Sequence, residues 1–160
     1  MIFVADAGPI ISFARAGRLE LLRQVVGELW IPEAVYQELV TKGAGRPGAE
    51  EASRGEWMKR KPITQPTAAL ALPSTLGDGE REAIMLAQEL RAVLIVDDAD
   101  ARDIALRLGI SVLGSLGILR EAKLQGIISA VKPHLDALRQ HHFRLSDALY
   151  QTFLQQIGEP

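Results

Sequence analysis

The sequence predicts a single-domain α/β protein with a central parallel sheet that is covered by helices on both faces. Short apolar runs alternate with helical patterns along the chain, and two of these runs end directly in aspartates. Strands that alternate with helices pair in parallel, because each helix returns the chain to the same edge of the sheet. A chain of 160 residues that is 48% hydrophobic can close one core but is short for two. We therefore expect residues 1–160 to form one domain.

In the first part of the chain, strands are expected at 2–5 and 29–31, and helices at 10–26 and 32–40. The first of these helices is expected to break near Gly17, and the second begins with a proline, which suits the first helical position. A β-α-β-α order results.

The elements expected in the second part continue this alternation: a helix at 80–91, a strand at 93–96, a helix at 103–108, a strand at 110–113 and a helix at 115–126. Between the two parts, residues 43–79 are rich in Gly and Pro, and we expect one short helix and a strand there, near the basic cluster Lys59-Arg60-Lys61. Ser115 and Ser146 are expected to cap helices. Residues from about 127 are expected to be helical and to pack on the same domain.

Composition excludes several kinds of chemistry. The chain has no cysteine, so disulfides, thiolate zinc sites and cysteine nucleophiles cannot explain its function. With a net charge of only −2, a nucleic-acid partner would have to be held by local basic patches. The N-terminus lacks a basic leader pattern, and no apolar run approaches the roughly 18 residues of a membrane span. We expect a soluble, unprocessed protein of the reducing cytoplasm.

Acidic residues follow two predicted strands at the point where each strand ends. Asp6 closes the first strand, and Asp97 and Asp98 close the strand at 93–96. Ligands of open parallel sheets bind beyond the carboxyl ends of the strands, because loops and helix N-termini converge there. Each acid also has a purely structural interpretation, Asp6 as a turn former and one of the pair as a helix cap. Two such clusters at one edge favour a functional site.

Further acids lie on the predicted helices and can be sorted by helical periodicity. Glu38 lies one turn from the apolar residues Ala34 and Val35, so it does not avoid the apolar stripe. Glu80 and Glu82 point about 200° apart on one helix, so only one of them can face a given site. Glu80 lies within the apolar arc and is the better inward candidate, although a first-turn Glu can also simply complement the helix dipole.

Four inward acids at one end of a core require cations, because a buried carboxylate without a partner neutralises or destabilises the fold. Arg102 could neutralise at most one of them. Clustered oxygen ligands without Cys or well-spaced His suit Mg²⁺ or Mn²⁺. Such an ion polarises a phosphoryl oxygen and activates water, which predicts phosphodiester hydrolysis without a protein nucleophile. Ser115 is a helix cap or a hydrogen-bond donor that supports a ligand.

Several segments resemble the successive signatures of PIN-like domains. They are residues 4–11 (Val-Ala-Asp-Ala-Gly-Pro-Ile-Ile), 35–38 (Val-Tyr-Gln-Glu), 76–84 and 95–102 (Ile-Val-Asp-Asp-Ala-Asp-Ala-Arg). Residues 79–84, Gly-Glu-Arg-Glu-Ala-Ile, are similar to the Gly-Glu-x-Glu-Ala-Ile pattern of an uncharacterised prokaryotic branch, and residues 114–119 also fit that branch. The order and spacing of the segments together carry the resemblance. This sequence differs from many relatives in having Glu80 where they have Asp, and Val96 where they have Thr or Ser.

The resemblance implies a PIN-like α/β/α sandwich with a central parallel sheet and a metal-dependent endoribonuclease activity, often that of the toxin in a toxin–antitoxin pair. It implies an RNA substrate, a cognate antitoxin protein and a homodimer as well. The residues that it assigns as catalytic and metal-binding acids are Asp6, Glu38, Glu80 and Asp98, with Glu82 as the alternative to Glu80 and Asp97 beside Asp98. From the residues themselves, Ser115 and Arg102 are expected to support these ligands.

Two other functions fit parts of the pattern. A non-catalytic PIN-like domain could keep the acids for folding while it binds RNA or protein, and cleavage of a pooled RNA substrate would separate it from a nuclease. A phosphoacceptor domain of the receiver type also places acids at strand ends, but it needs a pair of acids after the first strand and a Lys after the last. Here the pair follows a late strand.

Overall fold

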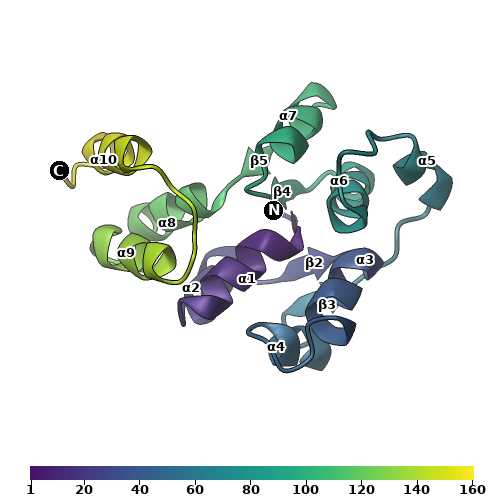
Figure 1. Ribbon diagram of the computed structural model, residues 1–160, viewed down its shortest axis with the longest axis horizontal. Coiled ribbons are helices and arrows are strands. Elements are labelled where there is room, and N and C mark those ends of the chain that lie inside the picture. The colour runs from purple at the N-terminus through teal and green to yellow at the C-terminus, as the bar shows by residue number, and fades with distance from the viewer.

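A five-stranded parallel sheet forms the centre of the computed structural model, which describes residues 1–160 (Figure 1). The strands are β1 (Phe3–Ala5), β2 (Leu29–Ile31), β3 (Met58–Arg60), β4 (Val93–Ile95) and β5 (Val112–Leu113). The helices are α1 (Ala7–Arg15), α2 (Leu19–Val26), α3 (Glu33–Tyr36), the π-helix η1 (Gln37–Thr41), α4 (Ala49–Arg54), α5 (Pro66–Leu70), α6 (Asp78–Leu90), α7 (Ala99–Arg107), α8 (Ser115–Leu124), α9 (Lys132–Gln140) and α10 (Asp147–Gln156). The predicted α/β fold with a parallel sheet and helices on both faces is confirmed.

The order of the strands creates a crevice beside β1. The sheet runs β3-β2-β1-β4-β5, so the chain builds outward from β1 to β3 and then returns to place β4 on the other side of β1. At such a reversal the loops that follow the two central strands diverge, which leaves a crevice beyond their carboxyl ends. Asp6 follows β1 and Asp97 follows β4. The order also differs from the 2-1-3-4-5 order of receiver domains, so the receiver interpretation is wrong.

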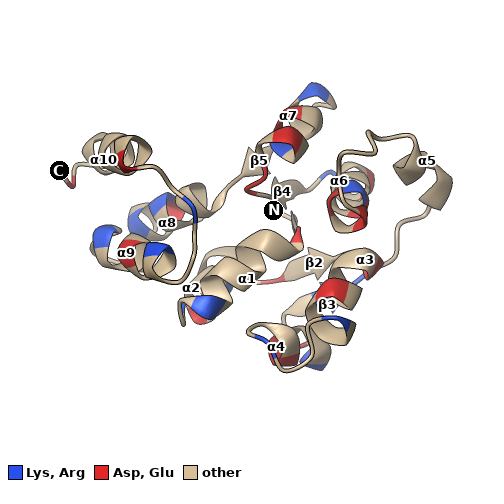
Figure 2. Cartoon of the chain, viewed as in Figure 1, with Lys and Arg blue, Asp and Glu red and all other residues tan.

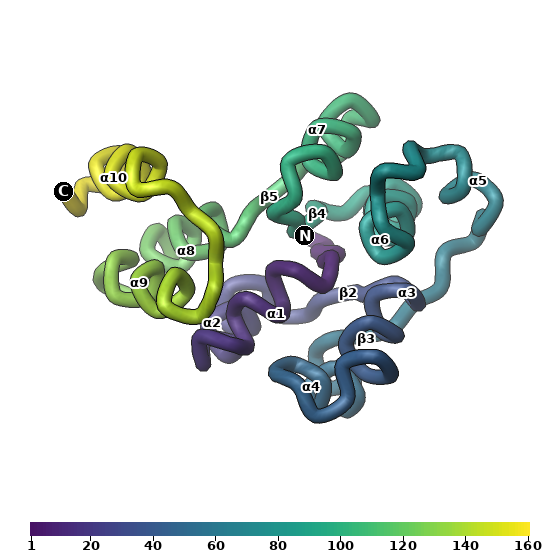
Figure 3. The backbone as a smooth tube through the Cα atoms, viewed as in Figure 1, coloured from purple at the N-terminus to yellow at the C-terminus, as the bar shows by residue number.

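Alternate residues of the strands face two hydrophobic cores. Val4 and Leu94 belong to a core with α6 and α7, whereas Ala5 and Ile95 belong to a larger core on the other face. The larger core takes in α1, α2 and the C-terminal helices α8–α10. The backbone trace in Figure 3 shows α8–α10 gathered beyond α1 and α2, on the side of the molecule away from α5 and α6. None of the helices is long and apolar enough to cross a membrane.

Several expected boundaries hold and others shift. The break at Gly17 is confirmed, and this glycine has a φ of +68°, which a residue with a side chain rarely adopts. Pro32 precedes α3 as its N-cap instead of opening the helix, and the helix widens into a π-turn after Tyr36. The excursion at 43–79 holds two short helices and the edge strand β3, one helix more than predicted.

Ser115 was expected to cap α8, but Gly114 occupies the N-cap position. Ser115 is instead the one buried polar residue, and it holds Asp97. Its backbone N–H donates to Asp97 Oδ1 at 2.7 Å and its hydroxyl donates to Asp97 Oδ2 at 2.5 Å. This pair of hydrogen bonds ties the end of β4 to the start of α8, and thereby fixes the loop that carries Asp98.

We expect Ser115→Ala to lower the free energy of unfolding by about 1.5–3 kcal/mol, because the charged Asp97 would lose a buried hydroxyl donor. Urea denaturation measures this. Ser111→Ala is the control, since the Ser111 side chain is exposed and makes no hydrogen bond. Equal midpoints for the two variants would contradict the role given to Ser115.

Candidate metal centre

Four acids from separate parts of the chain converge at the crevice, and we call them the acid centre. They are Asp6 before α1, Glu38 in η1, Glu80 in the first turn of α6 and Asp98 before α7. Figure 2 shows acidic segments on α6, at the β4–α7 turn and ahead of α1 facing one another across the middle of the molecule. The carboxylates influence one another electrostatically, as the pKa shifts below describe.

Glu38, which helical periodicity predicts to point inward, lies in the π-helix η1. From Gln37 onward the backbone bonds i to i+5, as in the bond of 2.8 Å from Lys42 N–H to the Gln37 carbonyl, so an α-helical wheel no longer gives the direction of side chains. Glu38 as a whole is exposed and not buried, but its carboxylate reaches across to the first turn of α6. Such single π-turns are frequent at functional sites.

Gly79 makes room for two of the acids. A Cβ at this position would lie 2.3 Å from Glu38 Oε1 and 3.4 Å from Asp6 Oδ1. Both carboxylates therefore flank the point where a side chain would stand. We had not singled out Gly79 from the sequence, although the Gly-x-Gly-Glu run at the start of α6 is the signal that could have drawn attention to it.

Glu80 has one satisfied and one unsatisfied carboxylate oxygen. Its Oε1 accepts a hydrogen bond of 3.0 Å from the N–H of Gly77, which completes a capping box at the start of α6. Its Oε2 is buried and has no hydrogen-bond partner. A buried acceptor without a partner is costly, so this oxygen is placed to receive a proton or a cation.

Three of the acids have raised pKa values. Burial is the largest cause at Asp6, where it and the charges of Glu38 and Asp98 raise the pKa to about 6 against the opposing backbone N–H groups of the α1 N-terminus. The pKa of Glu80 is raised by burial and then by Asp6 and Asp98. The pKa of Glu38 is raised by the burial of its carboxylate and by Glu80, with Lys42 acting in the opposite direction. The raised pKa values mean that burial and neighbouring carboxylates disfavour the ionised form of these three acids.

No basic side chain of the chain forms an ion pair with the acid centre, although Lys42 acts on Glu38 from a distance. None of the eight ion pairs includes Asp6, Glu38, Glu80 or Asp98. No three acidic or histidine side chains are arranged closely enough to form a metal cage as they stand. An ion such as Mg²⁺ keeps several waters and needs only one or two direct carboxylates, so the orphaned Glu80 oxygen and the converging acids fit a hydrated hard cation.

The other residues that the sequence suggested lie around the centre, not in it. Both oxygens of Asp97 are occupied by Ser115, as described above. Glu82 Oε1 accepts a hydrogen bond of 3.0 Å from the N–H of Ala34 and so joins α6 to the start of α3. Arg102 is exposed and makes no ion pair. Asp98 does cap α7, through a bond of 2.9 Å from Ala101 N–H to Oδ2.

The fold and the acid centre define a class of α/β domain that collects carboxylates at the crevice of a parallel sheet. A family model described as a PIN domain matches residues 2–159. Among solved structures, the chain is similar to a PilT N-terminus domain protein from the hyperthermophilic archaeon Sulfolobus solfataricus P2, with 18% identity, a TM-score of 0.50 and coverage of 91% of this chain and 100% of that chain. No curated protein matches.

The chain belongs to the PIN domain family, as its sequence motifs suggested. Domains of this family are generally nucleases that use divalent metal ions. The similar archaeal structure supports the fold alone, because its sequence identity is low.

The raised pKa of Asp6 predicts how stability depends on pH without divalent ions. Because this pKa is about 6 in the folded chain and 3.8 as a reference, the folded state binds more protons between these values, and stability is lost as pH rises through 6. Asp6→Asn should therefore stabilise the protein at pH 7.5 by at most about 3 kcal/mol and have little effect at pH 4. Urea denaturation at both values measures this, and a gain that is equal at the two values would contradict it.

Gly79→Ala should weaken the binding of divalent ions without unfolding the protein. The new methyl group would displace the flexible end of Glu38, while alanine is at least as good a helix former as glycine in the first turn of α6. We expect metal affinity to fall about tenfold or more, measured by calorimetry. Gly8→Ala is the matched control, because the nearest atom to its Cβ would be Asp6 Oδ2 at 3.9 Å, an ordinary contact. Equal affinities for the two variants would argue against a role for the Glu38–Gly79 contact.

Proposed function

We propose that this chain is a Mg²⁺- or Mn²⁺-dependent endoribonuclease and that residues 1–160 act as a single PIN-like domain. The observation that carries the proposal is the acid centre, in which carboxylates with raised pKa values meet at the crevice without any cation from the chain. Membership of the PIN domain family supports it. The chain has no cysteine, and its three histidines lie in the C-terminal helical region, so neither residue type supplies a nucleophile at the crevice. A metal-activated water would serve as the nucleophile instead.

The acid centre would hold the ion through Asp6, Glu38, Glu80 and Asp98. A bound divalent ion would polarise a phosphoryl oxygen and lower the pKa of a water molecule. Glu80 would use the unpartnered Oε2 toward the ion while Oε1 stays fixed by Gly77. Asp98 has one oxygen engaged in capping α7, which leaves the other to face the centre. Asp97 and Ser115 would keep the β4 loop in place.

A second function is a PIN-like domain that binds RNA or protein without cleaving it. The observation that favours it is that no three acidic side chains are arranged as a metal cage. Under that function the acids would be retained for the fold. Cleavage of a pooled RNA substrate in Mg²⁺ and in Mn²⁺ separates the two, because a binding module would retain RNA and leave it intact.

We further propose that the chain is the toxin of a toxin–antitoxin pair, acts in the cytoplasm, binds a cognate antitoxin protein and forms a homodimer. The support is the resemblance to the toxin-type branch of the PIN family. Light scattering at micromolar concentrations tests the dimer, for which we expect twice the 17.4 kDa mass of the chain. A monomer mass throughout would exclude it.

Asp6→Asn and Asp98→Asn should each reduce the rate of RNA cleavage by at least about a hundredfold, because each loses a charge that a hard cation requires. Asparagine is also a good helix cap, so Asp98→Asn should keep α7 intact. Thermal unfolding monitors the fold of both variants. Cleavage by a variant at the wild-type rate, or a wild type that binds no divalent ion by calorimetry, would make the acids structural.

Glu80→Gln and Glu82→Gln form a matched pair on one helix. Glu80→Gln should weaken metal binding and cleavage strongly, because the unpartnered oxygen of Glu80 faces the acid centre. Glu82→Gln keeps an oxygen that can accept from Ala34 and should leave cleavage within about threefold of wild type. Single-turnover cleavage compares them, and a larger loss at Glu82 would reverse the assignment.

A further inference from the structure

Beside the acid centre lies a groove of about 430 Å³ that the proposed function does not yet use. It begins at Asp97 and runs between the start of α8 and the loop that joins α9 to α10. Three arginines from distant parts of the chain line it, Arg102 on α7, Arg120 on α8 and Arg144 in the α9–α10 loop. We call it the arginine groove.

The three arginines are exposed and make no ion pair with the chain. The single acid in the lining is Asp97, and its two oxygens already accept hydrogen bonds from Ser115. The net charge of the lining is therefore positive, although the whole chain carries −2. An uncompensated set of guanidinium groups is suited to anions, and above all to phosphates, which arginine binds in bidentate fashion.

The wall of the arginine groove is apolar. Seven of its 13 lining residues are hydrophobic, and Phe143 and Leu149 are among them. Leu149 is 59% exposed, so it offers apolar surface to a ligand in the groove. A groove with charged groups and an apolar wall suits a polymer that has both phosphates and accessible bases. A single strand has both, whereas the bases of a duplex are hidden in the stack.

A second cationic hollow lies at another edge of the acid centre. It has a volume of about 190 Å³ and is lined by Glu38 together with Arg15 and Arg46. Both arginines are exposed, and neither takes part in an ion pair. Glu38 of the acid centre lines this hollow, and Asp97, the neighbour of Asp98, lines the arginine groove, so unpaired arginines adjoin the acid centre at two of its edges.

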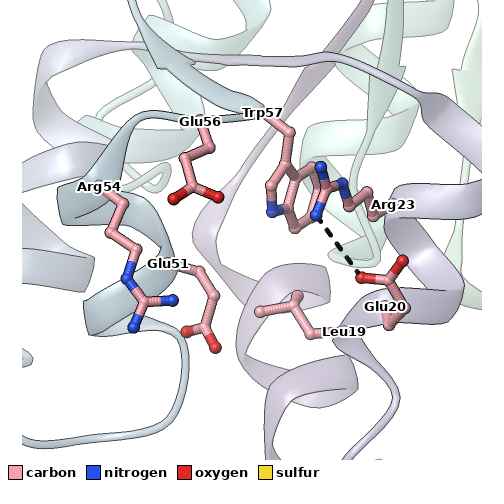
Figure 4. A pocket seen from close by; sticks show the side chains of 7 residues that line it. All are labelled: Leu19, Glu20, Arg23, Glu51, Arg54, Glu56 and Trp57. Carbon is pink, nitrogen blue, oxygen red and sulfur yellow. Dashed lines mark ion pairs between the residues drawn. The ribbon is translucent and has the colours of Figure 1, made fainter.

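The charges of a third hollow, between α2 and α4, show that this pattern is not general. Figure 4 shows Arg23 and Arg54 there among three glutamates, with Arg23 paired to Glu20 at 3.8 Å. Arg54 pairs with Glu50 at 2.8 Å. Compensated arginines of this kind offer little to an anion. The two hollows beside the acid centre differ in having arginines without partners.

From these observations we propose that a single RNA strand crosses the acid centre, with its phosphates held by the arginine groove on one side and by Arg15 and Arg46 on the other. The inference rests on the proposed nuclease function and adds the path of its substrate. The bases lie along the apolar wall near Phe143, so contact there tolerates many sequences. An acidic segment of a partner protein is the competing occupant of the same groove, and the test below includes it.

The experiment measures binding of a fluorescein-labelled single-stranded RNA of 20 nucleotides by anisotropy in EDTA, so that no cleavage occurs. R102A/R120A/R144A should raise the Kd roughly 30-fold and reduce the steepness of log Kd against log salt by about two, since about 0.7 counterions are released for each phosphate contact. R15A/R46A should raise the Kd less, with a reduction in steepness of about 1.4. A duplex RNA of the same sequence should bind more weakly to the wild type.

The matched control is R23A/R54A/R107A, which removes the same charge from arginines that pair with Glu20, Glu50 and Asp103. It should change the Kd by less than about threefold. Single charge reversals, R102E and R144E, repeat the test if the triple variant unfolds. Equal losses in the two triple variants, or none in the groove variant, would overturn the proposal.

Two further outcomes separate the groove from the nuclease. Loss of binding in the groove variant together with no cleavage by the wild type in Mg²⁺ or Mn²⁺ would support the groove and contradict the proposed function. Cleavage by the groove variant with an unchanged KM would support the proposed nuclease function and contradict the role of the groove. If an acidic 15-residue peptide binds the wild type and RNA does not, the groove serves a protein partner and the proposal is wrong.

Discussion

The structure depends on one constraint, which is that four carboxylates must be held together at the crevice of the sheet without a cation from the chain. Their mutual repulsion and their partial burial oppose folding, and the raised pKa values of Asp6, Glu38 and Glu80 record that cost. The surrounding structure tolerates it through local devices. The capping box fixes one oxygen of Glu80, the missing side chain at Gly79 makes room for Glu38, and Ser115 anchors the β4 loop through Asp97. Strain of this kind is typical of sites that gain a ligand.

The parts of the site that were predictable from the sequence are those that depend on strand ends and on a regular helix. Asp6 and Asp98 are candidates because the carboxyl ends of parallel strands meet at one edge. The wheel of α6 predicts different directions for Glu80 and Glu82, and in the structure Glu82 bonds to Ala34 while Glu80 stays near Gly77. Glu38 is predicted to point inward, and its carboxylate lies beside Gly79 and Asp6, although the residue as a whole is exposed. The α-helical wheel does not describe its surroundings in full, because η1 is a π-helix. The cap assigned to Ser115 was wrong because its hydroxyl has a better acceptor 18 positions earlier, in Asp97. Long-range pairs of this kind leave no local pattern.

The distribution of basic residues shows the same limit. The one basic cluster visible in the sequence, Lys59-Arg60-Lys61, lies on and after the edge strand β3, and Arg60 there is paired with Glu33 at 2.6 Å and stacked 4.1 Å from the ring of Tyr36. The arginines that are free to meet an anion come from five separate segments, and only the fold brings them to the two sides of the acid centre. A net charge near zero therefore hides a strong local separation of charge, with an acidic middle and basic flanks. That arrangement suits a polyanion whose phosphates are held at the basic flanks.

The central claim is that the acid centre is built to exchange protons for a divalent cation. The most direct measurement is the number of protons released when Mn²⁺ binds, obtained by calorimetry in buffers of different ionisation enthalpy. At pH 6, where Asp6 is half protonated, binding should release about half a proton from this residue, with a further contribution from Glu38 and Glu80. At pH 8 the release should fall close to zero, and at pH 6 Asp6→Asn should remove the share that comes from Asp6. Binding that releases no proton at pH 6, or no binding at either pH, would contradict the account.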